Sequence, residues 1–274
     1  MPVITTNTAS NSALRYLNIN SESQANSVSK IASGSRITKA SDDAAGLAVG
    51  TSLQSDVTVL KQAATNASHG SSILQTADGG MSSISDIVQR MRSLATQALS
   101  GSVTDNERAY LDAEFQQLTD EIDGIASGTR FNDDSLLDGT SNWAAGIDFR
   151  VGTTASDKIN VKIADVTTTG LGINTSDVTS SANAATALTA LDAAVTSLSD
   201  ARADVGALIS RFEFRSDMLD TTIENTEAAQ SAIMDVDVAA EQSELASTKV
   251  LTQAAIAVLS QANSMPEQLL SLLR

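Results

Sequence analysis

The side chains that most often carry catalysis or bind metal are sparse in this chain. His69 is its single histidine and there is no cysteine, so the sequence offers no thiol nucleophile and no Cys/His ligand set. Asp42 and Asp43 are adjacent, and adjacent helical residues point apart, which disfavours a paired-carboxylate site. Ser27 and Lys30 match an S-x-x-K pattern, but the companion S-D-N and K-T-G motifs are absent. We therefore expect no enzyme activity, no metal and no cofactor.

The composition favours helices that pack closely through small residues. The chain is 42% hydrophobic but only 3% aromatic, so its apolar content is mostly Ala, Val, Leu and Ile. Pro2 and Pro266 are its two prolines, and the sequence between them lacks an obligatory helix breaker. The net charge of −16 disfavours binding to nucleic acid or to anionic membranes. We see neither a signal-peptide pattern nor a membrane-spanning apolar run, and expect no membrane insertion.

The two ends of the chain carry the spacing of a coiled coil. Apolar and small residues recur there at steps of three or four, which places them along one side of a helix. The predicted seams are Leu14, Leu17, Val28 and Ile31 near the start, and Leu245, Ala255, Leu259, Leu269 and Leu272 near the end. Residues 1–41 carry a net charge of +3 and residues 234–274 one of −3, so the ends are complementary. Because hydroxylated and small residues interrupt both seams, we expect assembly to complete them.

Two long helices are predicted between the ends, over about 42–99 and 188–223, from apolar residues at helical spacing. Ser41 is the predicted N-cap of the first of these, with acids in its first turn. Gly46 and Gly50 lie one turn apart in it. We interpret them as sites where another helix approaches the backbone closely.

A shorter helix and a β region are predicted between the two long helices. Thr104 and Glu107 form a capping box for a helix that ends at Gly128. Apolar and polar residues then alternate over 147–151 and 159–163, which predicts a hairpin. The predicted fold class is mainly α, with long antiparallel helices, terminal coiled-coil segments and a small β-hairpin region at the tip.

Four blocks of this sequence resemble bacterial flagellins. They are SGSRITKASDDAAGLAVG at 33–50, ILQTADGGMSSISDIVQRMRSLATQA at 73–98, ARADVGALISRFEFR at 201–215 and LSQANSMPEQLLSLLR at 259–274. The resemblance implies a structural subunit that polymerises with itself into the extracellular flagellar filament for swimming. It also implies a minimal form without large variable outer domains. The alternative is a hook–filament junction protein, which shares related terminal helices.

The resemblance further implies a domain division and a set of partners. Residues 1–41 and 234–274 would form the two halves of an inner core domain. Residues 42–233 would form the outer core domain, with its β tip at about 130–175. The implied partners are the flagellar type III export apparatus, an export chaperone, the filament cap and the hook–filament junction proteins.

One segment resembles the part of other flagellins that an innate Toll-like receptor reads. Gln89, Arg90, Arg92 and Leu94 match it, and Glu114 matches a second receptor contact. Ser93 stands where sensed flagellins commonly carry an acid. The alternative is that the two arginines pair with acids of neighbouring helices in the fibre.

Flagellins are often O-glycosylated on exposed hydroxyl residues, and the resemblance extends this expectation to two clusters. The candidate acceptors are Thr167, Thr168, Thr169, Thr179, Ser180 and Ser181.

Overall fold

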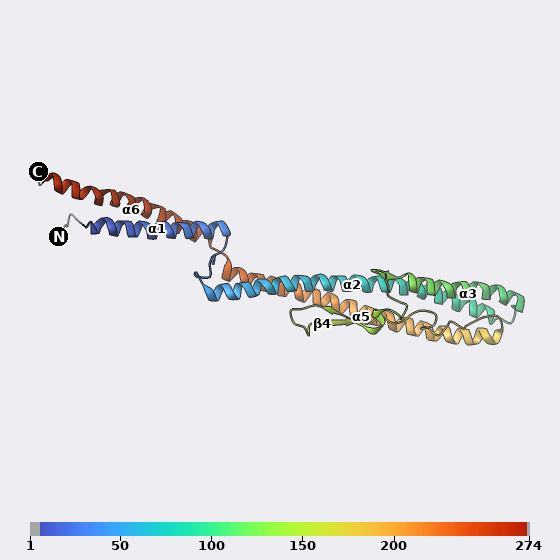
Figure 1. Cartoon of the computed structure of the whole chain (residues 1–274). Coiled ribbons are helices and arrows are strands. Elements are labelled where there is room, and N and C mark those ends of the chain that lie inside the picture. Colours follow the sequence, from blue (N-terminus) through green and yellow to red (C-terminus); the bar gives the residue numbers. More distant parts are fainter. Residues whose placement is uncertain (1–5, 273–274) are drawn as a thin grey trace. The chain divides into compact units, whose positions relative to one another are not determined.

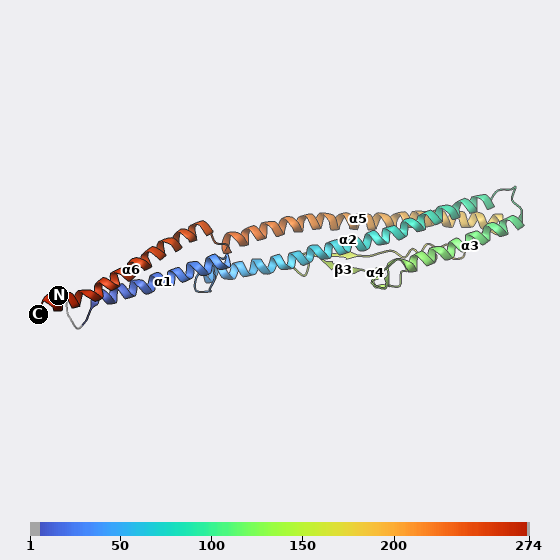
Figure 2. The same cartoon turned by 90° about the horizontal axis from the view of Figure 1, so that it is seen from above.

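The chain folds into two compact units, seen in a computed structural model that describes residues 6–272, with side chains up to Met265 (Figures 1 and 2). The first, here called the terminal unit, comprises Met1–Asp56 and Asn225–Arg274. The second, here called the body unit, comprises Val57–Glu224. The described residues are mostly helical and add two small two-stranded sheets. The predicted fold class, mainly α with a small β region, is therefore confirmed.

The terminal unit is built on two helices that lie side by side, α1 (Thr8–Ser33) and α6 (Val238–Leu272). Asn7 caps the start of α1, since its side-chain oxygen accepts a hydrogen bond from the backbone N–H of Ser10. Gly34 ends the helix in the left-handed conformation, with a φ of 71°, where a side chain would add strain. The helical spacing predicted at both ends of the chain is therefore confirmed as two helices.

The connection after α1 pairs with the connection before α6. Ser35 and Asp235 form an isolated antiparallel bridge. The backbone N–H of Arg36 donates to the carbonyl of Met234 at 2.6 Å, and its guanidinium donates to the carbonyl of Ile233 at 2.7 Å. These bonds satisfy the last carbonyls of α5 (Ser181–Met234), which have no partner within their own helix.

The start of α2 (Ala44–Ala98) differs from the prediction. Ser41 is not the N-cap, because the helix begins three residues later and Asp43 caps it. The Asp43 side chain accepts from the backbone N–H of Gly46 at 2.8 Å. Asp42 lies outside the helix and accepts from Thr38 and Lys39 in the preceding turn. Two adjacent carboxylates thus satisfy two different sets of backbone donors, and Ser41 lies in the turn before them.

Gly50 confirms the predicted close approach between helices. A Cβ built on it would lie 2.5 Å from the sulfur of Met234 on α5. At Gly46 a Cβ would lie 2.8 Å from Ile37 in the connection before α2. The absent side chains therefore let α2 pack tightly inside the terminal unit.

The body unit packs α2 and α5 with α3 (Asp105–Gly128) around one apolar core. The apolar stripe of α2 is fully buried at Leu74, Ala77, Met81, Ile84, Val88, Met91, Ala95 and Ala98. Phe115 and Ile122 of α3 and Phe212 of α5 complete this core. The predicted capping box starts α3, since the Glu107 carboxylate accepts from the backbone N–H of Thr104 at 2.7 Å.

The β region follows α3 as β1 (Arg130–Phe131), β2 (Asp134–Ser135), the single turn α4 (Asn142–Ala145), β3 (Ile147–Arg150) and β4 (Lys158–Val161). The predicted hairpin is confirmed: β3 and β4 are antiparallel, with Ile147 opposite Val161. It does not extend beyond the helices as a tip. Phe149 packs edge-to-face on Phe212, with ring centres 5.6 Å apart, because the hairpin needs α5 to cover its apolar face.

Candidate functional site

Small side chains dominate the contact between α1 and α6. Ala13 and Ser27 of α1 and Thr248, Ala255 and Ala262 of α6 are buried. Four predicted seam residues lie half-buried beside them, namely Leu17, Ile31, Leu245 and Leu259. A seam of small residues lets the two backbones approach closely, but it buries little apolar surface. The pair therefore keeps much of its apolar surface for contacts outside the chain.

Two other predicted seam residues, Leu14 and Val28, are not buried in this contact. Leu14 is 47% exposed and Val28 is 48% exposed, both on one flank of α1. The predicted seam of α1 thus has a part that is half-buried within the chain and a part that is exposed. Leu269 and Leu272 were predicted for the seam of α6, and their side chains lie outside the described residues.

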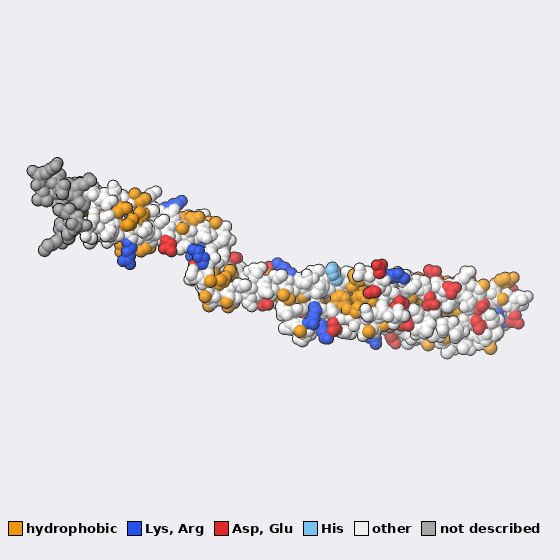
Figure 3. Space-filling view, viewed as in Figure 1, with side chains coloured by type: hydrophobic (Ala, Val, Ile, Leu, Met, Phe, Trp, Pro, Cys, Tyr) orange, Lys and Arg blue, Asp and Glu red, His pale blue; other side chains and the backbone are white. Residues whose placement is uncertain are grey.

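A second open stripe runs along α6. Leu251, Val258 and Met265 are exposed and spaced by seven residues, which puts them on one side of the helix. A polar stripe of Gln242, Lys249, Gln253 and Ser260 lies on a different side. Apolar side chains are visible on the surface of the α1 and α6 pair (Figure 3). Exposed apolar stripes of this kind are typical of surfaces that bind another protein.

An ion pair between described residues links the oppositely charged ends. The Lys30 ammonium on α1 lies 3.9 Å from the Glu241 carboxylate on α6, and both side chains are partly buried. An ion pair at this distance contributes little to stability and mainly favours the antiparallel alignment of the two helices. The charge complementarity predicted from the sequence thus involves Lys30.

In the body unit, the arginines of the receptor-like segment pair with acids on two other helices. Arg90 on α2 donates twice to Glu114 on α3, at 2.9 and 2.6 Å. Arg92 pairs with Asp192 on α5 at 2.6 Å. Gln89 is exposed beside them, whereas Leu94 is buried in the core. The structure therefore brings Arg90 and Glu114 together, and Leu94 serves packing in the folded chain.

The candidate glycosylation residues differ in accessibility. Thr168 is buried, and its hydroxyl donates to Asp123 at 2.8 Å, which argues against it as an acceptor. The hydroxyls of Thr167 and Thr179 donate to Asp165 and Asp177. Thr169 and Ser181 are exposed, whereas Ser180 is half-buried.

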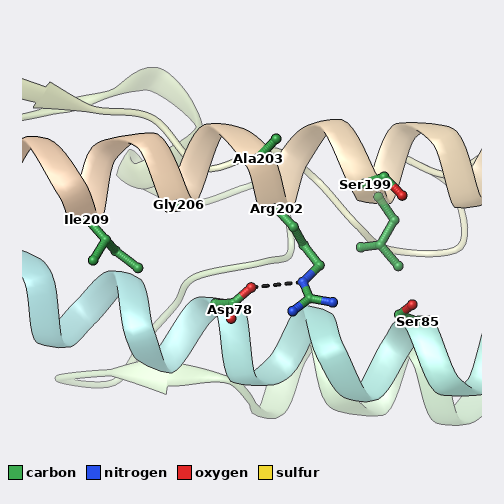
Figure 4. A pocket seen from close by; sticks show the side chains of 8 residues that line it. Asp78, Ser85, Ser199, Arg202, Ala203, Gly206 and Ile209 are labelled. Atoms are coloured by element: carbon green, nitrogen blue, oxygen red, sulfur yellow. Dashed lines mark hydrogen bonds and ion pairs between the residues drawn. The ribbon is translucent and has the colours of Figure 1, made fainter.

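A groove in the body unit, about 460 Å³ in volume, lies between α2 and α5 (Figure 4). Arg202 reaches across it from α5 and donates to Asp78 on α2 at 2.9 Å. This hydrogen bond and the charges of Asp78 and Asp86 raise the pKa of the Arg202 guanidinium. Ser85 and Ser199 also line the groove, and its lining residues include no histidine. The arrangement joins two helices and offers no acid–base or nucleophilic pair.

The described residues form neither a metal site nor a membrane span. No cluster of three His, Cys, Asp or Glu side chains there could hold a metal ion. Among the described helices, none combines the length and apolarity needed to cross a bilayer.

Sequence reasoning missed two exposed aromatic residues, Tyr110 on α3 and Phe214 on α5. Neither belongs to the apolar stripe of its helix. A large aromatic residue outside the stripe was the signal that could have revealed them, since folding alone does not require it there.

A helical protein whose terminal helices leave apolar stripes open has the features of a protein that assembles through those helices. Two family models match the chain: the bacterial flagellin N-terminal helical region over residues 4–142 and the C-terminal helical region over residues 188–273. The chain belongs to the bacterial flagellin family.

Individual relatives match over nearly their whole length. The flagellin of Halalkalibacterium halodurans is 36% identical, over 99% of this chain and 100% of that one. The flagellin of Bacillus subtilis is also 36% identical, over 98% of each chain. The crystal structure of Bacillus cereus flagellin matches with a TM-score of 0.51 at 34% identity, covering 56% of this chain and 88% of that one. A putative flagellar hook-associated protein from Vibrio parahaemolyticus shares the fold, with a TM-score of 0.58 at 13% identity.

Membership in this family defines what the chain does. It is a structural subunit, not an enzyme, and it polymerises with itself into the extracellular flagellar filament. It is a compact form without a large outer domain. The near-complete match to flagellins favours the filament subunit over the alternative of a hook–filament junction protein.

Proposed function

We propose that the subunits join through the stripes that α1 and α6 leave open. The stripe on α1 includes Leu14 and Val28, and the stripe on α6 comprises Leu251, Val258 and Met265. The observation that carries this proposal is the exposure of these apolar residues along helices whose closed faces hold mostly small side chains. A neighbouring subunit would cover them and complete the seams.

Burial of these residues would supply the driving force for polymerisation. Complete burial of one Leu, Val or Met side chain stabilises by about 1.5–3 kcal/mol. Several such side chains in each subunit would offset the entropy lost when a subunit joins the end of the filament. We also propose the division that the flagellin resemblance implies, into an inner core of residues 1–41 and 234–274 and an outer core of 42–233. It puts both open stripes in the inner core.

A substitution in the α6 stripe tests the assignment. Val258→Asp would place a charge where a neighbouring subunit packs, so the critical concentration for polymerisation should rise at least tenfold. Gln253→Asp is the matched control, because it adds the same charge on the polar side of the same helix. Sedimentation and electron microscopy give the readout. Normal filaments from Val258→Asp would refute the proposed seam.

We also propose partners for this subunit on the export route and at the filament ends. They are the export apparatus with a chaperone, the cap and the hook–filament junction proteins. The open apolar stripes support a chaperone, because such surfaces aggregate unless they are covered before assembly. A chaperone that covers them should bind wild-type monomer more tightly than Val258→Asp.

We also propose that the Arg90, Arg92 and Glu114 cluster is the part of the monomer that an innate Toll-like receptor contacts. The support is that the Arg90 and Glu114 side chains are 54% and 42% exposed. Both can therefore contact a protein from solvent without unfolding of the subunit.

A further inference from the structure

The two most exposed large apolar side chains among the described residues are both aromatic. Tyr110 is 78% exposed and Phe214 is 75% exposed, and both belong to the body unit. They lie on different helices and in surroundings of opposite charge. Exposed aromatic residues beside charged groups are enriched at the centres of protein interfaces.

Phe214 lies at a locally basic hollow of about 390 Å³ between α5 and the hairpin. Met218 and Ile159 form its apolar part, and Lys158, Arg211 and Arg215 contribute its cations. Asp157 also lines the hollow, and Lys158 pairs with Asp148 at 2.6 Å. Arg215 is held in place, since it donates to the carbonyl of Val151 at 2.8 Å and lies 3.3 Å from Asp157. Arg211 is exposed. Because Asp148 and Asp157 neutralise Lys158 and Arg215, Arg211 is the cation of this hollow that attracts an acidic partner.

Tyr110 lies on a strongly acidic helix. Over its length α3 holds seven acids, and its one basic side chain, Arg108, is buried. Glu107, Glu114 and Glu121 share the side of the helix that carries Tyr110, because they are three, four and eleven residues from it. The result is an exposed aromatic ring on an acidic face, the counterpart of the basic hollow around Phe214.

These two surfaces lie too far apart to meet within one chain. Glu114 pairs with Arg90 and Asp192 pairs with Arg92, which puts the Tyr110 face at about the level of Asp192 on α5. Phe214 lies 22 residues further along the same helix. At 1.5 Å per residue that is about 33 Å. Complementary surfaces at different positions on the chain join copies head-to-tail. Such heterologous contacts form an open-ended polymer instead of a closed dimer.

We propose that the acidic face around Tyr110 of one copy docks on the basic hollow around Phe214 of the next copy. The tyrosine ring enters the hollow beside Phe214 and Met218, and Glu121 faces Arg211. The proposal rests on the chain's polymerisation with itself. It adds a contact between body units to the contact proposed for the terminal helices.

Charge reversal tests the polarity of this contact. Arg211→Glu and Glu121→Lys should each raise the critical concentration about tenfold, because each puts like charges together. The double variant should recover most of the loss, since it restores opposite charges in reversed order. Arg130→Glu and Asp204→Lys are matched controls: both residues are exposed, and neither lines the two surfaces. An unrescued double variant, or controls that fail equally, would overturn the proposal.

The aromatic residues give an independent test that does not rely on charge. Tyr110→Ala and Phe214→Ala should each raise the critical concentration about tenfold, as truncation of an interface hot spot does. Both residues are exposed, so the monomer's helical circular dichroism and melting temperature should be unchanged. Filaments that form at the wild-type critical concentration from both variants would refute the docking contact.

The two assembly proposals fail in different ways. If Val258→Asp polymerises normally but Arg211→Glu does not, the seam on α6 is wrong and the body contact stands. If Arg211→Glu and Phe214→Ala polymerise normally while Val258→Asp does not, the body contact is wrong and the seam stands. A cryo-EM map of wild-type filaments supports the docking contact if Tyr110 of one subunit contacts Phe214 of another, and overturns it otherwise.

Discussion

Arg90 on α2 and Glu114 on α3 form a paired hydrogen bond, because both Nε and Nη2 of the guanidinium donate to the same carboxylate oxygen, at 2.9 and 2.6 Å. The sequence separates them by 24 residues, and the turn between two helices brings them together. Because both side chains are about half exposed, the pair contributes at most about 1 kcal/mol to stability. It can therefore be removed without unfolding the subunit.

The first prediction concerns receptor sensing. Arg90→Ala should abolish whatever Toll-like receptor response the monomer gives, while its melting temperature changes little. Ser93→Glu should raise the response, because it supplies the acid that sensed flagellins commonly carry. A receptor reporter assay with purified monomers measures both, with Arg130→Ala as the control. Equal responses from wild type and both variants would mean that the cluster serves only the fold.

The second prediction concerns the dependence of assembly on α6. Deletion of residues 235–274 removes this helix and leaves the body unit, whose apolar core has no member in α6. The truncated chain should remain soluble and helical by circular dichroism and should not sediment as filaments. Filaments of normal length from this truncation would contradict an assembly driven by the terminal helices.

The third prediction compares two glycines on α2. A Cβ at Gly70 would lie 2.7 Å from the fully buried ring of Phe212, whereas a Cβ at Gly79 would meet nothing within 4 Å. Gly70→Ala should therefore destabilise the body unit by about 1–3 kcal/mol, because the rigid ring must shift. Gly79→Ala should stabilise it by about 0.5–1 kcal/mol, since alanine restricts the unfolded chain more than glycine does. Urea denaturation of the monomers measures both, and a loss of stability in Gly79→Ala would contradict this account.

The fourth prediction concerns pH. Hydrogen bonds from the backbone N–H and the hydroxyl of Thr104 hold the pKa of the Glu107 carboxyl below its ordinary value of 4.5. A pKa that is lower in the folded state contributes stability above the unfolded value, and this contribution disappears as the pH falls through the folded value. The melting temperature of the wild type should thus decrease as the pH drops below about 4.5. The Glu107→Gln variant should have a lower melting temperature than the wild type at pH 7. Its melting temperature should change less as the pH falls, and scanning calorimetry measures both.

Much of the helical architecture was determined by the sequence itself, because helix period and capping depend on residues close in the chain. The helical spacing of apolar residues predicted a long helix over about 42–99, and α2 spans Ala44–Ala98. The Thr104 and Glu107 capping box predicted the start of α3. The flagellin resemblance rested in the same way on contiguous blocks, which is why the family could be identified from sequence.

Other features could not be predicted because neighbouring residues compete for the same structural role, and the sequence pattern does not show which of them takes it. Asp43 caps α2 instead of Ser41, although both types favour caps, because the preceding turn engages Asp42 and sets where the helix begins. The short β1–β2 hairpin was not predicted, although Asn132 and Asp133 adopt the positive φ values of 51° and 69° that its tight turn requires. Two strands of two residues each carry too little alternation to be recognised.

Only the tertiary structure decided which surfaces the chain closes and which it leaves open. Leu14 and Leu17 share one predicted seam, yet Leu17 is half-buried and Leu14 is exposed, because the rotation of α1 against α6 depends on contacts far apart in sequence. The pairing of Arg90 with Glu114 and the separation of Tyr110 from Phe214 likewise follow from how α2, α3 and α5 pack. The sequence thus determined that the chain forms helices and assembles, whereas the packing decided which side chains remain available for assembly.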